Sequence, residues 1–274
     1  MMLESAKRTV RDYFDEDAAG YLDAYGQRDS ARGEIFRERR ACVLQLLRTP
    51  VGRALDIGSG PGVFTPALLE LDQDAECWVV DLSPKMIEAA RACLAGPVQT
   101  GRVHFDVADI EHLPYAQGAF DTVLCVGVLQ YLRAAGPALE ELARVTRPGG
   151  QIILTFPNSR SPLNLLHRAA IAAARGGRSV ARLTGLRPAP DRLRLTFRQD
   201  IPNGWFALRH MVAAARRAGL HADPPVYHSL HFPFAIPGMQ AGLRFWDRTA
   251  NRAIQAGRCR TWGREVILRL VRQP

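Results

Sequence analysis

The segment ALDIGSGPGVF, residues 54–64, holds the densest group of residues that could bind a ligand. Its glycines, Gly58, Gly60 and Gly62, stand between an apolar run that predicts a strand and one that predicts a helix. Glycine lets the backbone turn tightly and approach a ligand, and the free N–H groups at the start of a helix favour an anionic group. A nucleotide-like ligand is therefore expected on this loop, with a plain strand-to-helix turn as the alternative.

Three carboxylates lie at the ends of predicted strands and narrow the choice of ligand. The spacing GxGxG differs from the dinucleotide fingerprint GxGxxG, and Asp56, two residues before the first glycine, would crowd a pyrophosphate but suits an ammonium group. Asp81 closes the second apolar run, CWVVD, where it can accept hydrogen bonds from ribose hydroxyls. Asp109 follows the third run and can accept from an exocyclic adenine amine. The expected apolar walls for the base are Leu82, Met86 and Ile110.

Short apolar runs and helical stretches alternate along this part of the chain and must position these residues. The helical stretch SPKMIEAARACLA begins with Ser83 as the predicted N-cap and a proline in its first turn. Strands and helices of this length in alternation are typical of a parallel sheet that is covered on both faces. The predicted strands are residues 54–57, 78–80, 103–107, 122–126 and 152–156.

Five segments between residues 53 and 156 together resemble the class I S-adenosylmethionine-dependent methyltransferases. They are most similar to the small-molecule branch typified by the ubiquinone and menaquinone biosynthesis enzymes. The segments are LDIGSGPG, VVDLSPKMIEAA, VADIEHLP, FDTVLCVGVLQYL and RVTRPGGQIILT. The resemblance implies an α/β fold with a Rossmann-like, doubly wound, seven-stranded sheet whose last strand is antiparallel. The segment REVILRLV, residues 264–271, would provide that strand.

The resemblance also implies where the cofactor S-adenosylmethionine and its product S-adenosylhomocysteine would bind. The loop from Gly58 to Gly62, Ser59 included, would cradle the methionine part, with Asp56 near its ammonium group. Asp81 would hold the ribose. The alternative role for Asp56, Asp81 and Asp109 is that of a helix N-cap or a solvated strand end. The remaining implied contacts are Leu82 and Met86 with the adenine, Asp109 and Ile110 with its edge, and the backbone of Val126 and Gly127 with the methionine and sulfonium.

A single methyltransferase domain over residues 1–274 is expected, because the elements after residue 200 would complete the same sheet. The segment YFDEDAAGYLDAY resembles the helix that covers the cofactor in related enzymes. Candidate contacts in this segment are Tyr21 and Tyr25. Farther along the chain, Arg39 or Arg40 could contact the methionine carboxylate, and ordinary helix packing is the alternative for each of these residues. The expected parts are a helical cap (1–50), the cofactor-binding core (51–156), an inserted basic lid (157–200) and the completion of the sheet (201–274), with a helix over 205–220 and a strand over 226–232.

The sequence identifies no catalytic residue. Transfer from a sulfonium is an in-line displacement, so the protein mainly aligns the acceptor and excludes water, and a base is needed only where an alcohol or phenol must lose its proton. The segment CVGVLQYL lacks the Asn or Asp followed by Pro-Pro and an aromatic that nitrogen methyltransferases commonly carry there. Gln130 and Tyr131 are candidate pocket residues, with the start of the next helix as the alternative. The histidines that could act as a base are His167, His210, His228 and His231.

The net charge of +9 is distributed unevenly. Residues 1–150 hold 16 basic and 22 acidic side chains, whereas residues 151–274 hold 20 and 5. Nine arginines and one acid fall between residues 160 and 198, in a lid whose predicted helix has Leu163 and Leu166 on one side and His167 elsewhere. Such a lid could contact an anionic membrane or admit an acidic or lipid-like acceptor, and a solvated lid is the alternative. Aromatic residues for stacking on bases are scarce there, which makes nucleic acid an unlikely partner.

The rest of the composition predicts a cytoplasmic protein. With 47% apolar residues the chain is not disordered as a whole, and its start lacks the apolar core of a signal peptide. The five cysteines form no zinc-binding pair, so no metal is expected and each is interpreted as a buried thiol. The sequence thus predicts methyl transfer to oxygen or carbon of a small acceptor, for example in natural-product, quinone or lipid biosynthesis. The alternatives are a regulatory or assembly protein that binds the cofactor without turnover, and an RNA methyltransferase.

Overall fold

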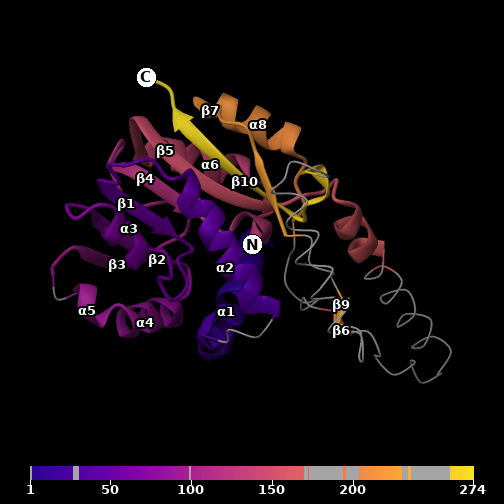
Figure 1. Ribbon diagram of the computed structural model, residues 1–274, viewed down its shortest axis with the longest axis horizontal. Helices are drawn as coiled ribbons and strands as arrows, with labels where there is room; N and C mark the ends of the chain where they lie inside the picture. The colour runs from indigo at the N-terminus through magenta and orange to yellow at the C-terminus, as the bar shows by residue number, and fades with distance from the viewer. Residues whose placement is uncertain are drawn as a thin grey trace.

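One sheet organises the computed structural model, which describes residues 2–26, 31–98, 100–169, 172, 194–195, 204–229, 234–235 and 260–274. Five neighbouring strands are parallel in the order β3-β2-β1-β4-β5, and β10 runs antiparallel between β5 and β7 (Figure 1). The strands are β1 (Arg53–Ile57), β2 (Glu76–Asp81), β3 (Val103–Val107), β4 (Phe120–Cys125), β5 (Thr146–Pro157), β7 (Leu220–Ala222), β8 (Val226–His228) and β10 (Glu265–Arg272), while β6 (Arg194–Leu195) pairs separately with β9 (Phe234–Ala235).

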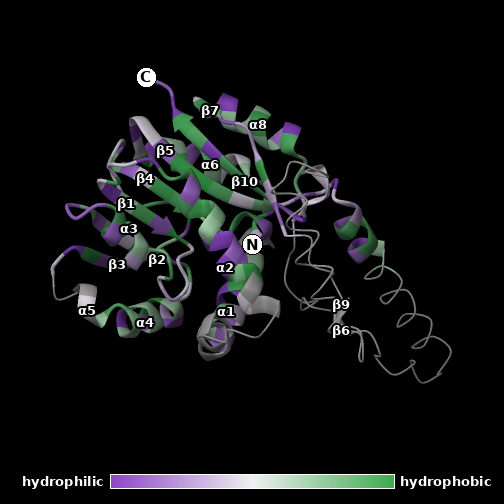
Figure 2. Cartoon of the chain, in the orientation of Figure 1, coloured by the Kyte–Doolittle hydropathy of each residue, from purple (hydrophilic) through white to green (hydrophobic). Residues whose placement is uncertain are grey.

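Helices cover both faces of the sheet. One buried apolar cluster joins α6 and α8 to the sheet, and a second joins α2, α3 and α4 to the opposite face. Strands that are buried on both faces are apolar along their length, which Figure 2 shows as green strands beneath helices of mixed colour. The helices are α1 (Met2–Gly26), α2 (Ala31–Leu46), α3 (Thr65–Leu71), α4 (Pro84–Cys93), α5 (Ala95–Val98), α6 (Gly136–Val145) and α8 (Leu208–Arg217), with 3-10 turns η1 (Leu129–Tyr131) and η2 (Arg260–Trp262).

The expected topology is confirmed, with one difference near the C-terminus. The last strand, β10, is antiparallel as expected, and the Ser83 side chain caps α4 by accepting a hydrogen bond from the Met86 N–H at 3.1 Å. The helix expected over 205–220 is shorter, because α8 ends at Arg217 and Leu220 already pairs with β10. The edge position beside β10 is therefore shared by two short strands, β7 and β8. As a result, the seven expected positions are filled by eight strands.

The described start of the lid buries polar side chains, whereas the sequence left open which face of this helix would be buried. Residues 162–169 are helical, but Leu166 is 47% exposed whereas Asn164 and His167 are buried. Polar contacts decide this orientation, since Asn164 and His167 both meet the Arg264 guanidinium, at 2.9 Å and 3.4 Å. Most of the lid, including Ala170, Ile171 and Ala174, lies outside the described residues.

The cysteines are only partly as expected. Cys77 and Cys125 are buried and Cys42 is half-buried, but Cys93, at the end of α4, is exposed. The fifth, Cys259, lies outside the described residues. Within the described ranges, no helix has the length and apolar character needed to cross a membrane.

Candidate cofactor site

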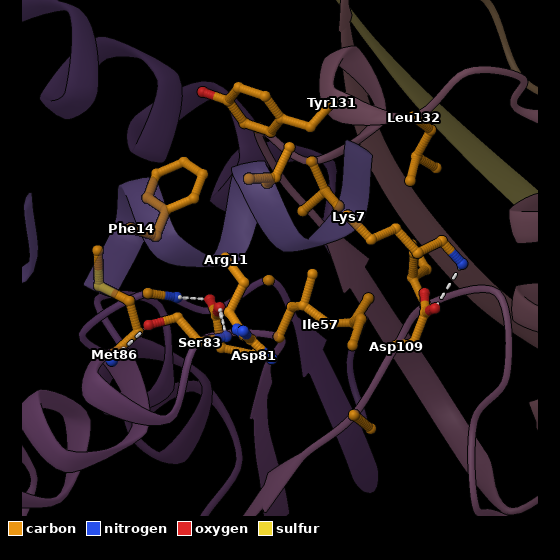
Figure 3. A pocket seen from close by; sticks show the side chains of 18 of the residues that line it. Lys7, Arg11, Phe14, Ile57, Asp81, Ser83, Met86, Asp109, Tyr131 and Leu132 are labelled. Atoms are coloured by element: carbon orange, nitrogen blue, oxygen red, sulfur yellow. Dashed lines mark hydrogen bonds and ion pairs between the residues drawn. The ribbon is translucent and has the colours of Figure 1, made fainter. Parts of the chain in front are cut away.

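A cavity of about 770 Å³, its open mouth included, lies where the parallel strands end. The chain order of the strands reverses between β1 and β4, and ligands of open α/β sheets bind at the carboxyl ends beside such a point. Figure 3 shows α1 crossing the cavity and Asp81 and Asp109 on the side opposite Tyr131 and Leu132. The expected site residues that line it are Gly58, Gly60, Asp81, Leu82, Met86, Asp109, Ile110, Val126, Gly127, Tyr21 and Tyr131, whereas Asp56, Ser59, Gly62 and Gln130 lie outside its lining.

The glycine loop needs glycine for two different reasons. At Gly58 the backbone has φ +66°, and a Cβ would lie 2.1 Å from Val128 Cγ2, so any side chain would clash. At Gly60 the φ is +53°, but the nearest atom to a Cβ would be a Tyr21 ring carbon at 3.6 Å, which is an ordinary contact. Gly58 is therefore required for packing, while Gly60 leaves its backbone open toward the cavity that it lines.

Asp81 holds the glycine loop to the end of β2. Its carboxylate accepts hydrogen bonds from the N–H groups of Gly60 and Ser83, each at 2.9 Å. Burial raises the pKa of Asp81, and the backbone N–H groups of Ser83, Gly60 and Leu82 act against that rise. The carboxylate thus fixes the loop and lines the cavity at the same place.

Asp56 is a buried carboxyl group that lacks a full set of partners. It is 2% exposed, and its Oδ2 has no hydrogen-bond partner among the described residues. Burial, and secondly the nearby Asp81, raises its pKa to about 7. A buried carboxylate is costly without a cation beside it, so this position favours a ligand that brings a positive charge.

The first helix is tied to the core by polar contacts on both sides of the cavity. Lys7 forms ion pairs with Asp109, at 2.5 Å, and with Glu111. Farther along α1, Asp15 accepts a hydrogen bond from the Ser83 hydroxyl at 2.5 Å. Between them the Phe14 ring packs edge-on against Tyr131, with ring centroids 5.2 Å apart. The cavity is therefore roofed by α1.

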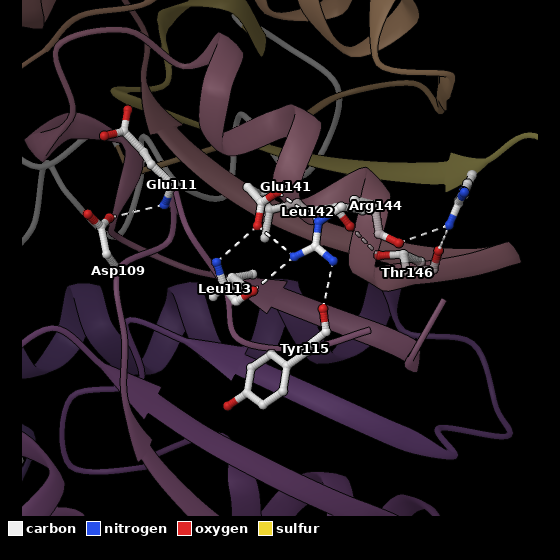
Figure 4. Close-up of polar contacts among 9 residues, drawn as sticks. Asp109, Glu111, Leu113, Tyr115, Glu141, Leu142, Arg144 and Thr146 are labelled. Carbon is white, nitrogen blue, oxygen red and sulfur yellow. Dashed lines mark hydrogen bonds and ion pairs between the residues drawn. The ribbon is translucent and has the colours of Figure 1, made fainter. Parts of the chain in front are cut away.

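The segment that carries Asp109 and Ile110 is anchored to α6 (Figure 4). Arg144 donates to the carbonyl oxygens of Leu113 and Tyr115 and also pairs with Glu141, which in turn accepts from the Leu113 N–H. The hydrogen bond from Arg144 outweighs burial and lowers the pKa of Glu141, so the anchor stays charged. These contacts hold the turn after β3 in place without touching the cavity.

Comparison with known proteins agrees with this geometry. Residues 55–154 match a family described as a methyltransferase domain. The chain contains a class I S-adenosylmethionine-dependent methyltransferase domain. The match covers the glycine loop, Asp81 at the end of β2 and Asp109 after β3, and S-adenosylmethionine is the cofactor of this class.

The relatives of the methyltransferase domain include several oxygen methyltransferases. The chain is 34% identical over 148 residues to a malonyl-[acyl-carrier protein] O-methyltransferase of Halorhodospira halophila, covering 54% of this chain and 47% of that protein. It is 31% identical over 132 residues to a ubiquinone biosynthesis O-methyltransferase of Xanthomonas oryzae, covering 48% and 51%. The chain thus spans about half the length of the curated relatives it matches.

Solved structures with the same fold extend over nearly the whole chain. The magnesium protoporphyrin IX methyltransferase of Synechocystis, solved with bound S-adenosylhomocysteine, superposes with a TM-score of 0.64 over 97% of this chain and 100% of that one, at 18% identity. At this identity the likeness establishes the fold of the methyltransferase domain and nothing more.

Other expected contacts of the methyltransferase domain lie just behind the cavity wall. The Arg39 guanidinium stands beside Gly127 and pairs with Glu265, whereas Arg40 donates to the Val63 carbonyl at 3.3 Å. Gln130 donates its side-chain N–H to the Gly127 carbonyl at 2.8 Å, so it supports the wall instead of lining it. Of the four histidines, His167 and His228 are buried in polar clusters and His210 is exposed on α8, while His231 and the Tyr25 side chain lie outside the described residues.

The sequence missed the part of the wall that α1 supplies. Lys7, Val10, Arg11 and Phe14 line the cavity together with Tyr21. Their offsets from Tyr21 are 14, 11, 10 and 7 residues, which place all of them on one face of a helix. Because Tyr21 is an expected contact on a covering helix, its helical spacing from these four residues is the signal that could have identified them.

Proposed function

We propose that this protein transfers the methyl group of S-adenosylmethionine to an oxygen or carbon atom of a small organic acceptor. The observation that carries the proposal is the set of acidic groups at the ends of neighbouring strands: Asp81 and Asp109 line the cavity, and Asp56 is buried at the end of β1, next to the glycine loop. A buried carboxyl with an unpartnered oxygen, a carboxylate at the end of β2 and an acceptor after β3 are what the ammonium, ribose and adenine of this cofactor need. The methyltransferase domain match and the oxygen- and carbon-methyltransferase names of relatives support the same reaction.

The residues present fit the cofactor part by part. Asp56 would receive the ammonium group, the loop from Gly58 to Gly62 the methionine backbone, and Asp81 the ribose. When bound, S-adenosylmethionine supplies an activated methyl group on a good leaving sulfur. The chain's own residues would then align the acceptor and exclude water. The adenine would lie against Leu82 and Met86 with Asp109 and Ile110 at its edge, and the backbone of Val126 and Gly127 would adjoin the sulfonium.

Oxygen or carbon is favoured over nitrogen as the acceptor atom. The segment from Cys125 to Leu132 contains no Asp or Asn that could accept hydrogen bonds from an amine. The one amide in it, Gln130, donates its side-chain N–H to the Gly127 carbonyl and lies outside the cavity lining. Tyr21, Phe14 and Tyr131 form a line of ring contacts beside Gly60, which supports an acceptor with an aromatic or largely apolar body.

An anionic or lipid-like acceptor is supported by the surroundings of the lid. Leu165, Leu166 and Trp262 are 50%, 47% and 46% exposed, and the segment from residue 160 to 198 carries nine arginines and one acid. Apolar side chains beside arginines suit an acceptor with an acyl chain and an acidic group, or a peripheral contact with an anionic membrane.

The test is to follow a labelled methyl group into fractions of a cell extract. Purified protein is incubated with S-[methyl-¹³C]adenosylmethionine and either the small-molecule fraction or the RNA and protein fraction. We expect ¹³C in small molecules, with a methoxy or C-methyl shift in the NMR spectrum. Label in RNA would contradict the proposal, as would cofactor binding without any methyl transfer to either fraction.

A further inference from the structure

Strand β3 leaves its outer edge open to another strand. It is the outermost strand of the sheet (Figure 1), and among the described residues it pairs with β2 alone, in unbroken register over Val103–Val107. The free N–H and C=O groups of such an edge can bind a further strand, and natural proteins prevent this with proline, bulges or charged side chains. The sequence of β3, VHFDV, has no proline and no bulge, so only its charges could prevent pairing.

The direction of the backbone groups determines which residues of β3 a further strand would meet. The Arg102 carbonyl accepts a hydrogen bond from β2, and the Ala108 N–H donates one to β2. Because backbone groups alternate between the two edges of a strand, every second residue between these two faces away from the sheet. These outward residues are Val103, Phe105 and Val107. Among the described residues, the hydrogen bond on this side comes from Arg91 Nη2, which at 3.5 Å from the Phe105 carbonyl is too long to compete with a backbone donor.

The residues of β3 are complementary to themselves in the antiparallel direction. A pair of these strands centred on Phe105 places His104 opposite Asp106 of the second copy. In the same register Phe105 lies opposite its own copy, and Val103 lies opposite Val107. These three are the outward residues, so each of them can exchange both backbone hydrogen bonds with its opposite residue. His104 and Asp106 then occupy the positions without backbone hydrogen bonds, where Cα atoms are only about 4.5 Å apart and side chains interact most closely.

Aromatic side chains hold His104 and Asp106 on one face of β3. His104 stacks on Trp78, with ring centroids 4.4 Å apart, and Asp106 accepts from the Tyr115 hydroxyl at 2.7 Å. Within the described residues neither of the two forms an ion pair. An imidazole can donate to a carboxylate in either protonation state, so a second copy would supply the missing partner to both. It would also cover Val107, which is 52% exposed.

We propose that two copies of this chain pair through β3, antiparallel and centred on Phe105, and so form one continuous sheet. The interface is isologous, because the same five residues meet their own copies across a two-fold axis. The strands of the two copies point in opposite directions, so the two cavities lie at opposite edges of the joined sheet. One pair of strands is a small interface, and we expect a reversible dimer with a dissociation constant on the order of 10 µM. The inference does not depend on the proposed function.

Sedimentation equilibrium of the full chain, between about 1 and 200 µM, tests for the dimer. His104→Asp sets two carboxylates opposite each other, and Asp106→Lys sets an ammonium group opposite His104. Each change acts twice across the two-fold axis and should weaken the dimer about 5- to 10-fold. An equimolar mixture of the two variants restores opposite charges at both positions, so a heterodimer should form with about the wild-type affinity. A wild type that is monomeric throughout, or a dimer that neither variant weakens, overturns the inference.

Two further variants test the register of the pair. Val107→Pro removes an N–H that points away from the sheet, so the chain should keep its melting temperature and lose the dimer. In Phe105→Cys, made with Cys93→Ser to remove an exposed thiol, the two copies of position 105 lie about 5.5 Å apart between Cα atoms, within reach of a disulfide. Val107→Cys in the same background is the matched control, because its two copies would lie about 13 Å apart. A folded Val107→Pro that dimerises like the wild type, or equal cross-linking of the two cysteine variants, overturns the inference.

Discussion

Lys7 Nζ lies 2.5 Å from Asp109 Oδ2 and thereby joins the N-terminal half of α1 to the turn after β3 (Figure 3). The same ammonium group pairs with Glu111. Burial acts to lower the pKa of Lys7, but its hydrogen bonds to Asp109 and Glu111 outweigh that effect and raise it. The group expected to accept from the adenine is thus also the group that holds the roof of the cavity.

Replacing Lys7 with methionine should loosen the roof without unfolding the protein. We expect faster amide hydrogen exchange in residues 2–26 and a several-fold faster dissociation of S-adenosylhomocysteine. The free energy of unfolding should fall by only about 1 kcal/mol or less, because the pair is partly exposed. Lys85→Met, at an exposed lysine of α4, is the control. Unchanged exchange in α1 of Lys7→Met would show that the ion pairs do not hold the roof.

Cofactor binding should depend on pH through Asp56. Its pKa in the folded protein is raised to about 7 by burial and by Asp81, so below pH 7 the carboxyl must lose a proton before it can receive an ammonium group. The dissociation constant for S-adenosylmethionine should therefore rise by up to about tenfold for each pH unit below 7. Calorimetry in two buffers of different ionisation enthalpy at pH 6 should detect the released proton.

The raised pKa of Asp56 makes the protein without ligand less stable as the pH rises, although the same rise in pH strengthens cofactor binding. The folded state keeps a proton that the unfolded chain releases above the ordinary pKa of 3.8, so this group's contribution to the free energy of unfolding falls as the pH rises from about 4 to 7. Asp56→Asn should remove both dependences, gaining stability at pH 8 and losing affinity. A dissociation constant for S-adenosylmethionine that stays unchanged between pH 5.5 and 8 in the wild type would refute this role of Asp56.

His167 should make the base of the lid sensitive to acid. Burial, and secondly Arg264, lowers its pKa from 6.5 to about 4. The unfolded chain therefore binds a proton more readily than the folded one, and this contribution to stability is complete above pH 6.5 and is lost as the pH falls toward 4. Each unit of pKa difference corresponds to about 1.4 kcal/mol. Denaturant unfolding between pH 7 and 4.5 should show a smaller fall in the free energy of unfolding per pH unit in His167→Gln than in the wild type. Equal pH slopes in the two proteins would count against this role of His167.

The core of the site could be predicted because its signals are local. The glycine loop, Asp81 and Asp109 each follow a strand within a few residues, and parallel strands bring their carboxyl ends together. The side of the lid helix that packs on the core could not be predicted, because an apolar periodicity does not reveal that Asn164 and His167 both contact Arg264.

Contacts between distant segments could not be predicted. Arg39 and Glu265 are 226 residues apart, and the packing of α2 against β8 and β10 brings them together. The face that α1 turns to the cavity could have been found only from Tyr21, because Lys7 and Phe14 stand in a helix with charged residues on several sides. The assignment of individual residues to the cofactor stays a prediction.

Asp81 and Asp72 allow the most direct test of the cofactor site. Both carboxylates accept hydrogen bonds from backbone N–H groups, among them those of Gly60 and Ser83 for Asp81 and those of Val51 and Gly52 for Asp72, but Asp72 lies at the opposite end of β1. Calorimetric titration of S-adenosylhomocysteine should give binding that Asp81→Ala weakens by about 30-fold or more. Asp72→Ala should lower the melting temperature but keep the wild-type affinity. No binding by the wild type, or equal affinity in Asp81→Ala, would contradict the account.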